Sequence, residues 1–263
     1  MEKPVIVITH ERSGTHLLIN LINYDKKGEF YTIGYIPEGK AEFTIKNYKY
    51  YVYKDIIVNT YRENSVSKSH HQIEFMDEDL LDILFNKYKT IYLKRDVKDV
   101  LVSYYNFLKI KNSNEAEKYK NTIVYEKYTD NWKNFPEFKD WIFMNPFEIG
   151  MKYLAPYPDP HVIVEPENYI DRWLLHTNGW LKYEKNILIL NYEDILNDFK
   201  NQKEIIENYI GKKIADKIPD LHDKELPNFS PGKGIVGSHK NWMDDKLISK
   251  IDEYEKNYRR KVF

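Results

Sequence analysis

The sequence predicts a single α/β domain in which helices cover both faces of a parallel sheet. Short β-branched runs alternate with stretches whose apolar residues recur at helical spacing. No internal repeat and no Gly/Ser-rich or Pro-rich linker divides the 263 residues, so we assign residues 1–263 to one domain. Hydrophobic residues make up 42% of the chain, which is enough for a substantial core. Alternation of this kind is typical of parallel sheets.

The first expected elements are a strand over Val5–Thr9, a polar turn and a helix from Thr15 to about Tyr24. The later elements alternate in the same way: strand Val66–Ser69, a helix near Asp77–Lys87, strand Thr90–Lys94, a helix from Asp96 to about Lys109, a helix near Glu167–Tyr183, strand Ile187–Leu190, a helix to about Ile210 and a last helix at about Met243–Arg260. Residues 30–63 alternate apolar and polar around two turn signals, which predicts a small antiparallel β insertion. Residues 111–165 are expected to have little regular structure.

The composition excludes several classes of site and partner. Lysine plus arginine (40) nearly balance aspartate plus glutamate (41), so no overall field favours nucleic acid or an anionic membrane, and we expect neither as a partner. The absence of cysteine excludes disulfides, thiolate nucleophiles and cysteine zinc sites. No run approaches the roughly 20 apolar residues of a membrane span. We therefore expect a cytoplasmic protein.

The segment after the first expected strand, Val7–His16, has the composition of an anion-binding loop. A loop that leads from a strand into a helix presents unpaired backbone N–H groups and the positive end of the helix dipole. Gly14 allows a close backbone approach, and Ser13 and Thr15 add hydroxyl donors. The Walker pattern GxxxxGK[ST] is not matched, because its lysine and its magnesium ligand are both missing. An ordinary NTPase is therefore disfavoured, and the alternative is an N-capped helix start with a solvated arginine.

A second polar cluster, Lys68–His71, follows another expected strand. Ligands of an open parallel sheet bind beyond the carboxyl ends of its strands, where this cluster lies. Adjacent residues of an extended chain point to opposite faces, so His70 and His71 are not expected to share one metal ion. An imidazole titrates near neutrality, so one of them could act as a general base. The alternative is a histidine that serves only in packing or at the surface.

A third cluster at the same edge combines Arg95, directly after the strand at Thr90–Lys94, with Ser103. Ser103 lies seven residues beyond Asp96, on nearly the same helix face and about 10 Å along the axis. An arginine fork with a hydroxyl would bind a second anion, set apart from the first loop. A ligand with two separated phosphates would fit both places. The alternative is an arginine that pairs with Asp96 or Asp99.

Five segments, in the expected order along the chain, resemble the PAPS-dependent sulfotransferase family. Arg12–Thr15 (RSGT) is similar to its 5′-phosphosulfate loop, Lys68–His70 (KSH) to its catalytic histidine segment, and residues 95–105 (RDVKDVLVSYY) to its 3′-phosphate element. Residues 187–194 (ILILNYED) resemble the family's strand that ends in Tyr-Glu-Asp, and residues 232–241 (GKGIVGSHKN) resemble its closing segment.

The resemblance implies a P-loop-NTPase-like fold and a sulfotransferase that takes a sulfuryl group from 3′-phosphoadenylyl sulfate (PAPS). It further implies release of adenosine 3′,5′-bisphosphate (PAP) and no need for a metal ion. It assigns catalysis to Arg12 and to His70, the general base. The cofactor-binding residues that it implies are Arg12, Ser13, Gly14, Thr15, His16, Arg95, Ser103, Tyr192, Lys233 and Gly234. The acceptor would be a small molecule or glycan with a hydroxyl or amine, bounded by residues 30–63 and 111–165.

Several residues depart from the family pattern. Arg12 replaces the usual lysine, His16 replaces a threonine, and Gly232 replaces the closing arginine. Ser238 and His239 stand where the family has Asp-Trp. The sequence leaves two other functions open. One is a magnesium-dependent nucleotide kinase with a degenerate P-loop, and the other is a non-catalytic module that binds a bisphosphate.

Overall fold

The computed structural model describes residues 3–26, 31–32, 65–76, 78–118, 134–146, 148–149, 166–219 and 234–262. The chain divides into two compact units. The first unit comprises Met1–Arg95 and His176–Gly234. The second comprises Asp96–Leu175 and Ile235–Phe263.

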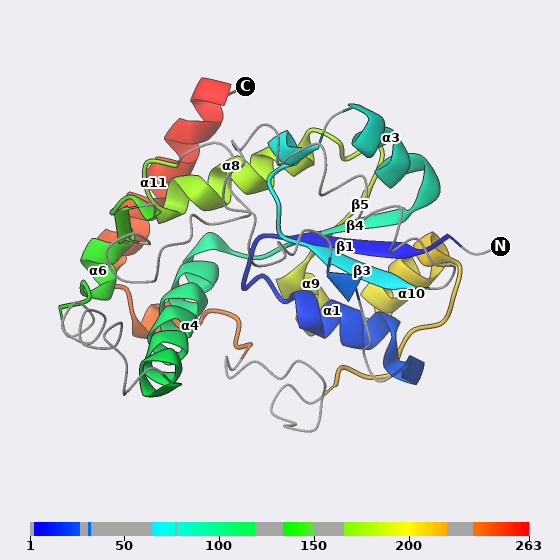
Figure 1. The fold of residues 1–263 in the computed structure, drawn as a ribbon, viewed down its shortest axis with the longest axis horizontal. Helices are drawn as coiled ribbons and strands as arrows, with labels where there is room; N and C mark the ends of the chain where they lie inside the picture. Colours follow the sequence, from blue (N-terminus) through cyan, green and yellow to red (C-terminus); the bar gives the residue numbers. More distant parts are fainter. Residues whose placement is uncertain are drawn as a thin grey trace. The chain divides into compact units, whose positions relative to one another are not determined.

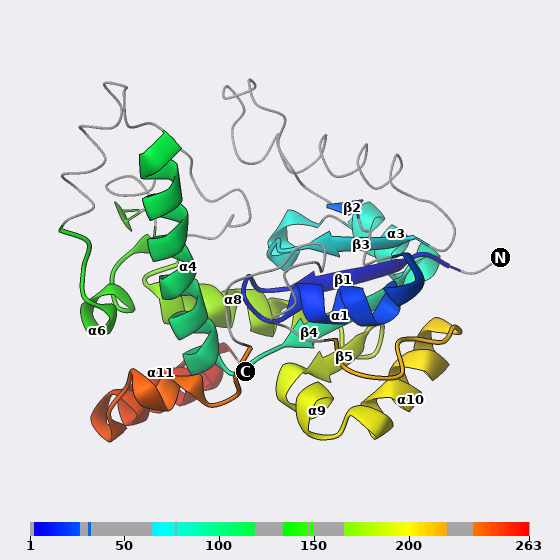
Figure 2. The same cartoon turned by 90° about the horizontal axis from the view of Figure 1, so that it is seen from below.

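The first unit contains a parallel five-stranded sheet (Figures 1 and 2). Its strands are β1 (Val5–Thr9), β2 (Tyr31–Thr32), β3 (Val66–Ser69), β4 (Lys89–Lys94) and β5 (Leu188–Asn191). They lie in the order β2-β3-β1-β4-β5, and every neighbouring pair is parallel. The predicted α/β class with a parallel sheet is therefore confirmed. Parallel strands bring their carboxyl ends to one edge of the sheet, where ligands of such folds bind.

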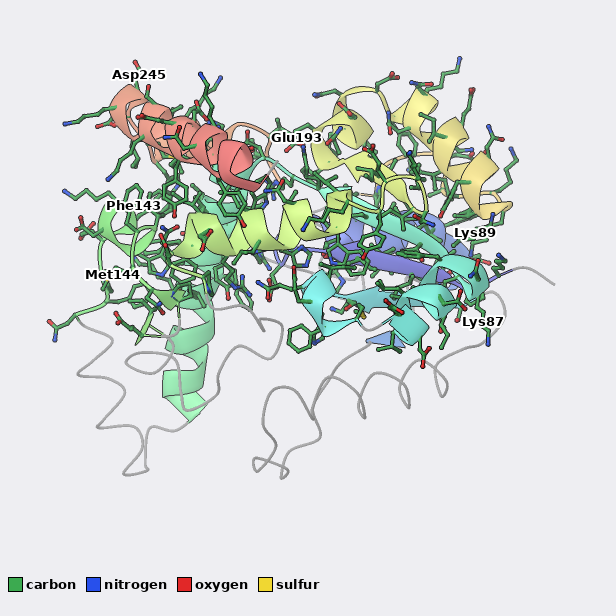
Figure 3. All side chains as sticks on the ribbon, turned by 90° about the horizontal axis from the view of Figure 1, so that it is seen from above. Lys87, Lys89, Phe143, Met144, Glu193 and Asp245 are labelled. Atoms are coloured by element: carbon green, nitrogen blue, oxygen red, sulfur yellow. The ribbon has the colours of Figure 1, made fainter. Side chains whose placement is uncertain are left out.

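Helices cover both faces of this sheet, as Figures 1 and 2 show. They are α1 (Thr15–Ile22), α3 (Glu78–Lys87), α9 (Tyr192–Asn197), α10 (Phe199–Ile210) and the end of α8 (Tyr169–Leu181), with the short 3₁₀ helices η1 (Tyr24–Lys26) and η2 (Ile73–Phe75). α1 and α10 lie on one face and α3 on the other. Lys87 and Lys89 mark the turn from α3 into β4 (Figure 3).

Alternate strand residues build the core on the α1 face. Val5 and Val7 of β1 and Ile91 and Leu93 of β4 are buried in one cluster with α1 residues such as Leu18. This period of two places every second side chain on the same face. Tyr92, between two of these residues, points the other way, and its ring stacks on that of Trp180 with centroids 6.4 Å apart. The continuous apolar run of β4 is thus explained by burial on both faces.

The predicted antiparallel insertion over residues 30–63 is wrong for the part that the structure describes. Tyr31–Thr32 form β2 and pair in parallel with β3, in register with Ser67 and Lys68. A parallel neighbour extends the edge of the main sheet and does not form a separate hairpin. Residues 30 and 33–63 lie outside the described residues.

The second unit is helical and has an aromatic core. Its elements are α4 (Val97–Lys118), α6 (Phe138–Trp141), the start of α8, the 3₁₀ helix η3 (Ser238–Asn241) and α11 (Asp245–Val262). Trp141 stacks on Tyr169 with ring centroids 3.9 Å apart, and Tyr105 packs edge-on to Phe138.

Helix α4 begins as expected but is longer than expected. The Asp96 carboxylate accepts the Lys98 backbone N–H at 2.8 Å, so it caps the helix as predicted. The helix continues to Lys118, which corrects the expected end near Lys109 and the irregular stretch expected from residue 111. Among the described residues, no helix is both long enough and apolar enough to span a membrane.

Candidate active site

The loop between β1 and α1 has two residues in the left-handed region of backbone space. Gly14, the residue before α1, has φ 98°, and Arg12 has φ 68°. Left-handed backbone is unfavourable for a residue with a side chain, so Arg12 stores local strain that the surrounding contacts must offset. The Ser13 N–H donates to the His10 carbonyl at 3.3 Å, which closes the turn. A strand–turn–helix loop therefore stands where the sequence predicts it.

Gly14 lies directly against the ring of Tyr192. A Cβ atom on Gly14 would lie 2.3 Å from Tyr192 Cδ2 and 2.5 Å from Cε2. The Tyr192 hydroxyl donates to the Gly234 carbonyl at 2.8 Å, so one buried tyrosine joins the loop to the start of the closing segment. The contact of Tyr192 with an adenine ring stays a prediction.

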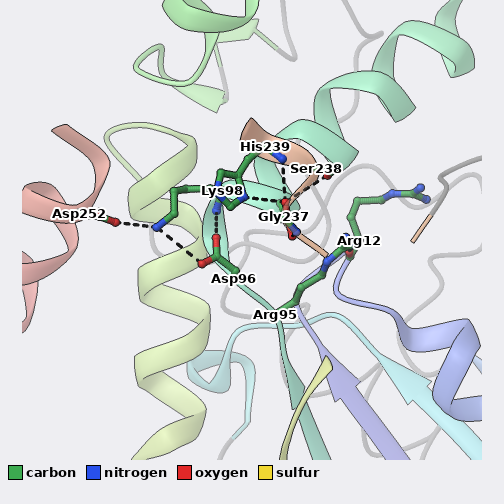
Figure 4. A network of polar contacts seen from close by, with 9 residues as sticks. Arg12, Arg95, Asp96, Lys98, Gly237, Ser238, His239 and Asp252 are labelled. Carbon is green, nitrogen blue, oxygen red and sulfur yellow. Dashed lines mark hydrogen bonds and ion pairs between the residues drawn. The ribbon is translucent and has the colours of Figure 1, made fainter. Parts of the chain in front are cut away.

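Arg95 contacts the same loop from the carboxyl end of β4. Its Nη1 donates to the Arg12 carbonyl at 3.2 Å, and its guanidinium carbon lies 4.5 Å from the centre of the Tyr192 ring (Figure 4 shows Arg12 and Arg95). A guanidinium over an aromatic face is attracted by the ring quadrupole. Arg95 is buried, although its charge would otherwise favour water.

Thr9, the last residue of β1, connects the loop helix to the histidine segment. Its hydroxyl lies 2.7 Å from the Thr15 hydroxyl and 3.0 Å from His70 Nδ1. His70 Nδ1 also lies 3.0 Å from the Thr9 carbonyl oxygen. A carbonyl oxygen only accepts, so this bond requires the proton on Nδ1 and leaves a lone pair on Nε2 of the neutral ring. That tautomer suits a general base.

His71 points to the opposite face, as the extended geometry predicts. Its side chain is fully buried, its Nδ1 lies 3.0 Å from the Ser69 hydroxyl, and its ring packs edge-on to Phe75. Its carbonyl accepts the Trp180 indole N–H at 3.0 Å. His71 is therefore a packing residue, and the two histidines do not share a site.

Lys68 and His16 bring two more nitrogen groups close to the loop. Lys68 Nζ lies 3.5 Å from His16 Nε2. Burial, then the charges of Lys68 and Arg12, lower the pKa of His16 to about 4, so its ring is neutral near pH 7 and can accept from the ammonium. Burial also lowers the pKa of Lys68. The result is a cluster of two cations and one neutral imidazole from α1, β3 and the loop.

Comparison with known proteins identifies the family. A family model for the sulfotransferase domain matches residues 2–228. The chain belongs to the sulfotransferase family. The guinea pig (Cavia porcellus) 3-alpha-hydroxysteroid sulfotransferase is 21% identical over 287 residues, which cover 99% of this chain and 84% of the relative.

Solved structures confirm the sulfotransferase fold. Mouse sulfotransferase SULT7A1 complexed with PAP is 16% identical with a TM-score of 0.55, covering 96% of this chain and 83% of that one. Retinol dehydratase in a complex with retinol and PAP is 19% identical with a TM-score of 0.52, covering 97% and 80%.

Within this sulfotransferase, the remaining expected site residues are only partly described. Ser13 Oγ is buried and has no hydrogen-bond partner among the described residues, as a donor reserved for a ligand oxygen would be. Ser103 lies on α4 in the second unit. Gly234 has φ 60°. Lys233 and Gly232 lie outside the described residues.

The sequence interpretation gave no role to Thr9, which contacts Thr15 and His70, or to Lys68, which lies beside His16. Strand alternation could have found both, because Thr9 and Lys68 have the same parity as the buried α1-facing residues Val7 and Val66. Among the described residues, no group of three or more His, Asp or Glu side chains could hold a metal ion.

Proposed function

We propose that this chain transfers a sulfuryl group from PAPS to a hydroxyl or amine of a small-molecule acceptor, with His70 as the general base. The observation that carries the proposal is the bond between His70 Nδ1 and the Thr9 carbonyl at 3.0 Å. It fixes the imidazole at the end of β1, next to the loop that resembles the phosphosulfate loop. It also leaves Nε2 as the basic nitrogen.

His70 Nε2 takes the acceptor proton while the acceptor oxygen or nitrogen attacks sulfur. The new bond to sulfur forms as the bond from sulfur to the bridging phosphate oxygen breaks, and the electron pair leaves with adenosine 3′,5′-bisphosphate. Such loose, in-line transfers depend on positioning and on charge stabilisation. The loop supplies Arg12, the backbone N–H groups of residues 13–15 and the buried Ser13 hydroxyl for the growing negative charge.

Lys68 adds a second cation to this arrangement. Its ammonium lies 3.5 Å from Nε2 of His16. The lowered pKa of His16, about 4, keeps that ring neutral near pH 7, so His16 adds no positive charge to the site. We assign His16 to the support of Lys68. Thr15, whose hydroxyl is bonded to Thr9, is assigned to the 5′-phosphosulfate together with Gly14.

We assign the remaining contacts with the sulfuryl donor from the sequence motifs. Arg95 and Ser103 are assigned to the 3′-phosphate, and Tyr192, Lys233 and Gly234 to the rest of the bisphosphate. The family match over residues 2–228 includes residues of both units. We accordingly treat residues 1–263 as one sulfotransferase domain.

The acceptor is proposed from the names of similar proteins. Those names refer to hydroxysteroids and to retinol, which are apolar molecules with one or few hydroxyl groups. We propose an acceptor of that class, a small apolar alcohol or phenol, in preference to a glycan.

Two measurements test the function. PAP should raise the melting temperature without magnesium, because a ligand that binds the native state stabilises it by mass action. A larger shift with ATP and magnesium than with PAP would favour the nucleotide kinase instead. Intact-mass analysis of pooled acceptors incubated with PAPS should then reveal a sulfuryl mass gain. Binding of PAP with no mass gain across steroid, phenol, sugar and peptide pools would favour the non-catalytic module.

A further inference from the structure

The side chain of Thr9 joins Thr15 and His70 in one short chain of hydrogen bonds within the first unit. Thr9 Oγ1 lies 2.7 Å from Thr15 Oγ1 and 3.0 Å from His70 Nδ1. Thr9 ends β1, Thr15 begins α1, and His70 directly follows β3. Thr9 and Thr15 are both buried, so this chain of hydrogen bonds is shielded from water.

The positions of the hydrogens in this chain follow from the Thr9 carbonyl. A carbonyl oxygen only accepts, so its 3.0 Å contact with His70 Nδ1 places a proton on that nitrogen. A protonated Nδ1 has no lone pair, so the Thr9 hydroxyl accepts from it and does not donate to it. The Thr9 hydrogen is therefore donated to Thr15 Oγ1. The hydrogen of the Thr15 hydroxyl then points away from Thr9.

This order suits the ligand assigned to Thr15. The oxygens of a 5′-phosphosulfate only accept, and the remaining Thr15 hydrogen is a donor for one of them. When His70 Nε2 takes the acceptor proton, Nδ1 keeps its own proton and the order does not change. The ring then becomes positive at one end of the chain while negative charge grows on the leaving 5′-phosphate at the other end. Hydrogen bonds in a chain polarise one another, so all of them strengthen in the transition state.

We propose that Thr9 is a positioning residue whose hydroxyl couples the general base His70 to Thr15 and the 5′-phosphosulfate. The inference rests on the proposed function for its ligand. A threonine suits this position because its β-branched side chain has few χ1 conformations, and pairing of Thr9 with Leu93 of β4 fixes its backbone. The Thr9 carbonyl remains when the side chain is replaced. The role of the hydroxyl can therefore be tested while the carbonyl still orients His70.

The first experiment compares Thr9→Val and Thr9→Ser with wild type in the full chain. Thr9→Val should lower kcat for sulfuryl transfer by about tenfold, because the charged ring loses an acceptor in the transition state. Its PAP affinity, measured by calorimetry, should change less than about threefold, since Thr15 still donates to the ligand. Thr9→Ser retains the hydroxyl and should stay within about threefold of the wild-type kcat. Equal losses in kcat and PAP affinity, or a serine variant as impaired as the valine variant, would overturn the inference.

Thr90→Val is the matched control. Thr90 is a fully buried strand threonine like Thr9, and its hydroxyl donates to the Leu84 carbonyl at 2.6 Å. It pairs with Ile6, three residues before Thr9, which places it roughly 10 Å from the end of β1. Its loss should lower the melting temperature but leave kcat and PAP affinity within about twofold of wild type. A fall in kcat as large as that of Thr9→Val would show that lost stability alone explains both variants.

A double-mutant cycle with Thr15→Val tests whether Thr9 acts through Thr15. Once the Thr15 hydroxyl is absent, Thr9→Val should lower kcat by less than about threefold more, because the chain of hydrogen bonds is already broken. Losses that multiply, so that each substitution has its full effect in the presence of the other, would show that Thr9 acts independently of Thr15 and would overturn the coupling.

Nuclear magnetic resonance separates this inference from the proposed function, because it needs no acceptor and no turnover. In the ligand-free protein the neutral His70 ring should carry its proton on Nδ1, and a proton on Nε2 instead would overturn the hydrogen order. PAP should shift the Nδ1 proton resonance of wild type, and Thr9→Val should show less than about half of that shift. Equal shifts in an active enzyme would refute the coupling alone. The expected shifts without sulfuryl transfer to any acceptor would refute the proposed function and leave the coupling standing.

Discussion

The ring of Tyr192 occupies the space in which a side chain at position 14 would lie. A Cβ atom on Gly14 would come within 2.3 Å of Tyr192 Cδ2, closer than real side chains approach one another. The Arg95 guanidinium lies over the same ring, and the Tyr192 hydroxyl donates to the Gly234 carbonyl. The glycine of the loop is therefore required twice, once for its left-handed backbone and once for this contact.

Gly14→Ala should destabilise the fold by roughly 2–4 kcal/mol, through backbone strain and through displacement of Tyr192. Gly211→Ala is the control, because Gly211 also has a left-handed φ of 81° but nothing lies within 4 Å of its added Cβ. That variant should lose only about 1 kcal/mol. Urea unfolding gives both values, and equal losses would show that the Tyr192 contact has no cost.

Arg95→Ala should weaken PAP far more than adenosine 5′-monophosphate. Loss of a charge-assisted contact to the 3′-phosphate is expected to cost roughly 2–4 kcal/mol, or about 30- to 1000-fold in affinity. The bond from Arg95 to the Arg12 carbonyl is lost for both ligands, so the monophosphate should lose about 1 kcal/mol. Ser103→Ala should cost PAP about 1–2 kcal/mol. Calorimetry with both nucleotides isolates the 3′ effect, and equal losses in Arg95→Ala would remove Arg95 from the 3′-phosphate site.

His70→Ala and His71→Ala should separate turnover from stability. The first should abolish turnover with PAP binding retained, because His70 is assigned to the acceptor proton. The second should leave the chemistry of the folded protein largely intact but cost roughly 2–3 kcal/mol of stability, since His71 is fully buried against Ser69 and Phe75. Turnover is compared well below both melting temperatures. If His71→Ala abolished turnover and His70→Ala did not, the general base would be His71 and the assignment of His70 would be wrong.

His16 should make the stability of the protein depend on pH in the mildly acidic range. Its pKa falls from 6.5 to about 4 on folding, mainly through burial. Between these values the unfolded chain binds the proton and the folded protein does not, so stability is present above pH 6.5 and is lost as the pH falls toward 4. From pH 7 to pH 5 wild type should lose roughly 2 kcal/mol more than His16→Thr. Urea unfolding at the two pH values gives the difference, and parallel losses would mean that His16 titrates normally in the fold.

The alternation of elements and the motifs at the strand ends were readable from the sequence. Val5–Thr9 and Val66–Ser69 are β-branched or alternating runs of strand length, and they form strands with those bounds. Local preference suffices there, since the side chains that define each strand are its own. His70 contacts Thr9 whereas His71 contacts Ser69 and Phe75, which agrees with the expectation that adjacent residues of an extended chain point to opposite faces. Membership of the sulfotransferase family rests on such local segments, and the family model confirms it.

Tertiary structure alone decided which distant groups meet. Lys68 lies beside His16, and His239 beside Asp99, although 52 and 140 residues separate the partners. The parallel pairing of Tyr31–Thr32 with β3 belongs to the same class. Each of these contacts needs a partner from elsewhere in the chain, which local preference does not specify. The strands could therefore be predicted from their own residues, whereas the partners of His16, Lys68 and Asp99 exist only once the chain has folded.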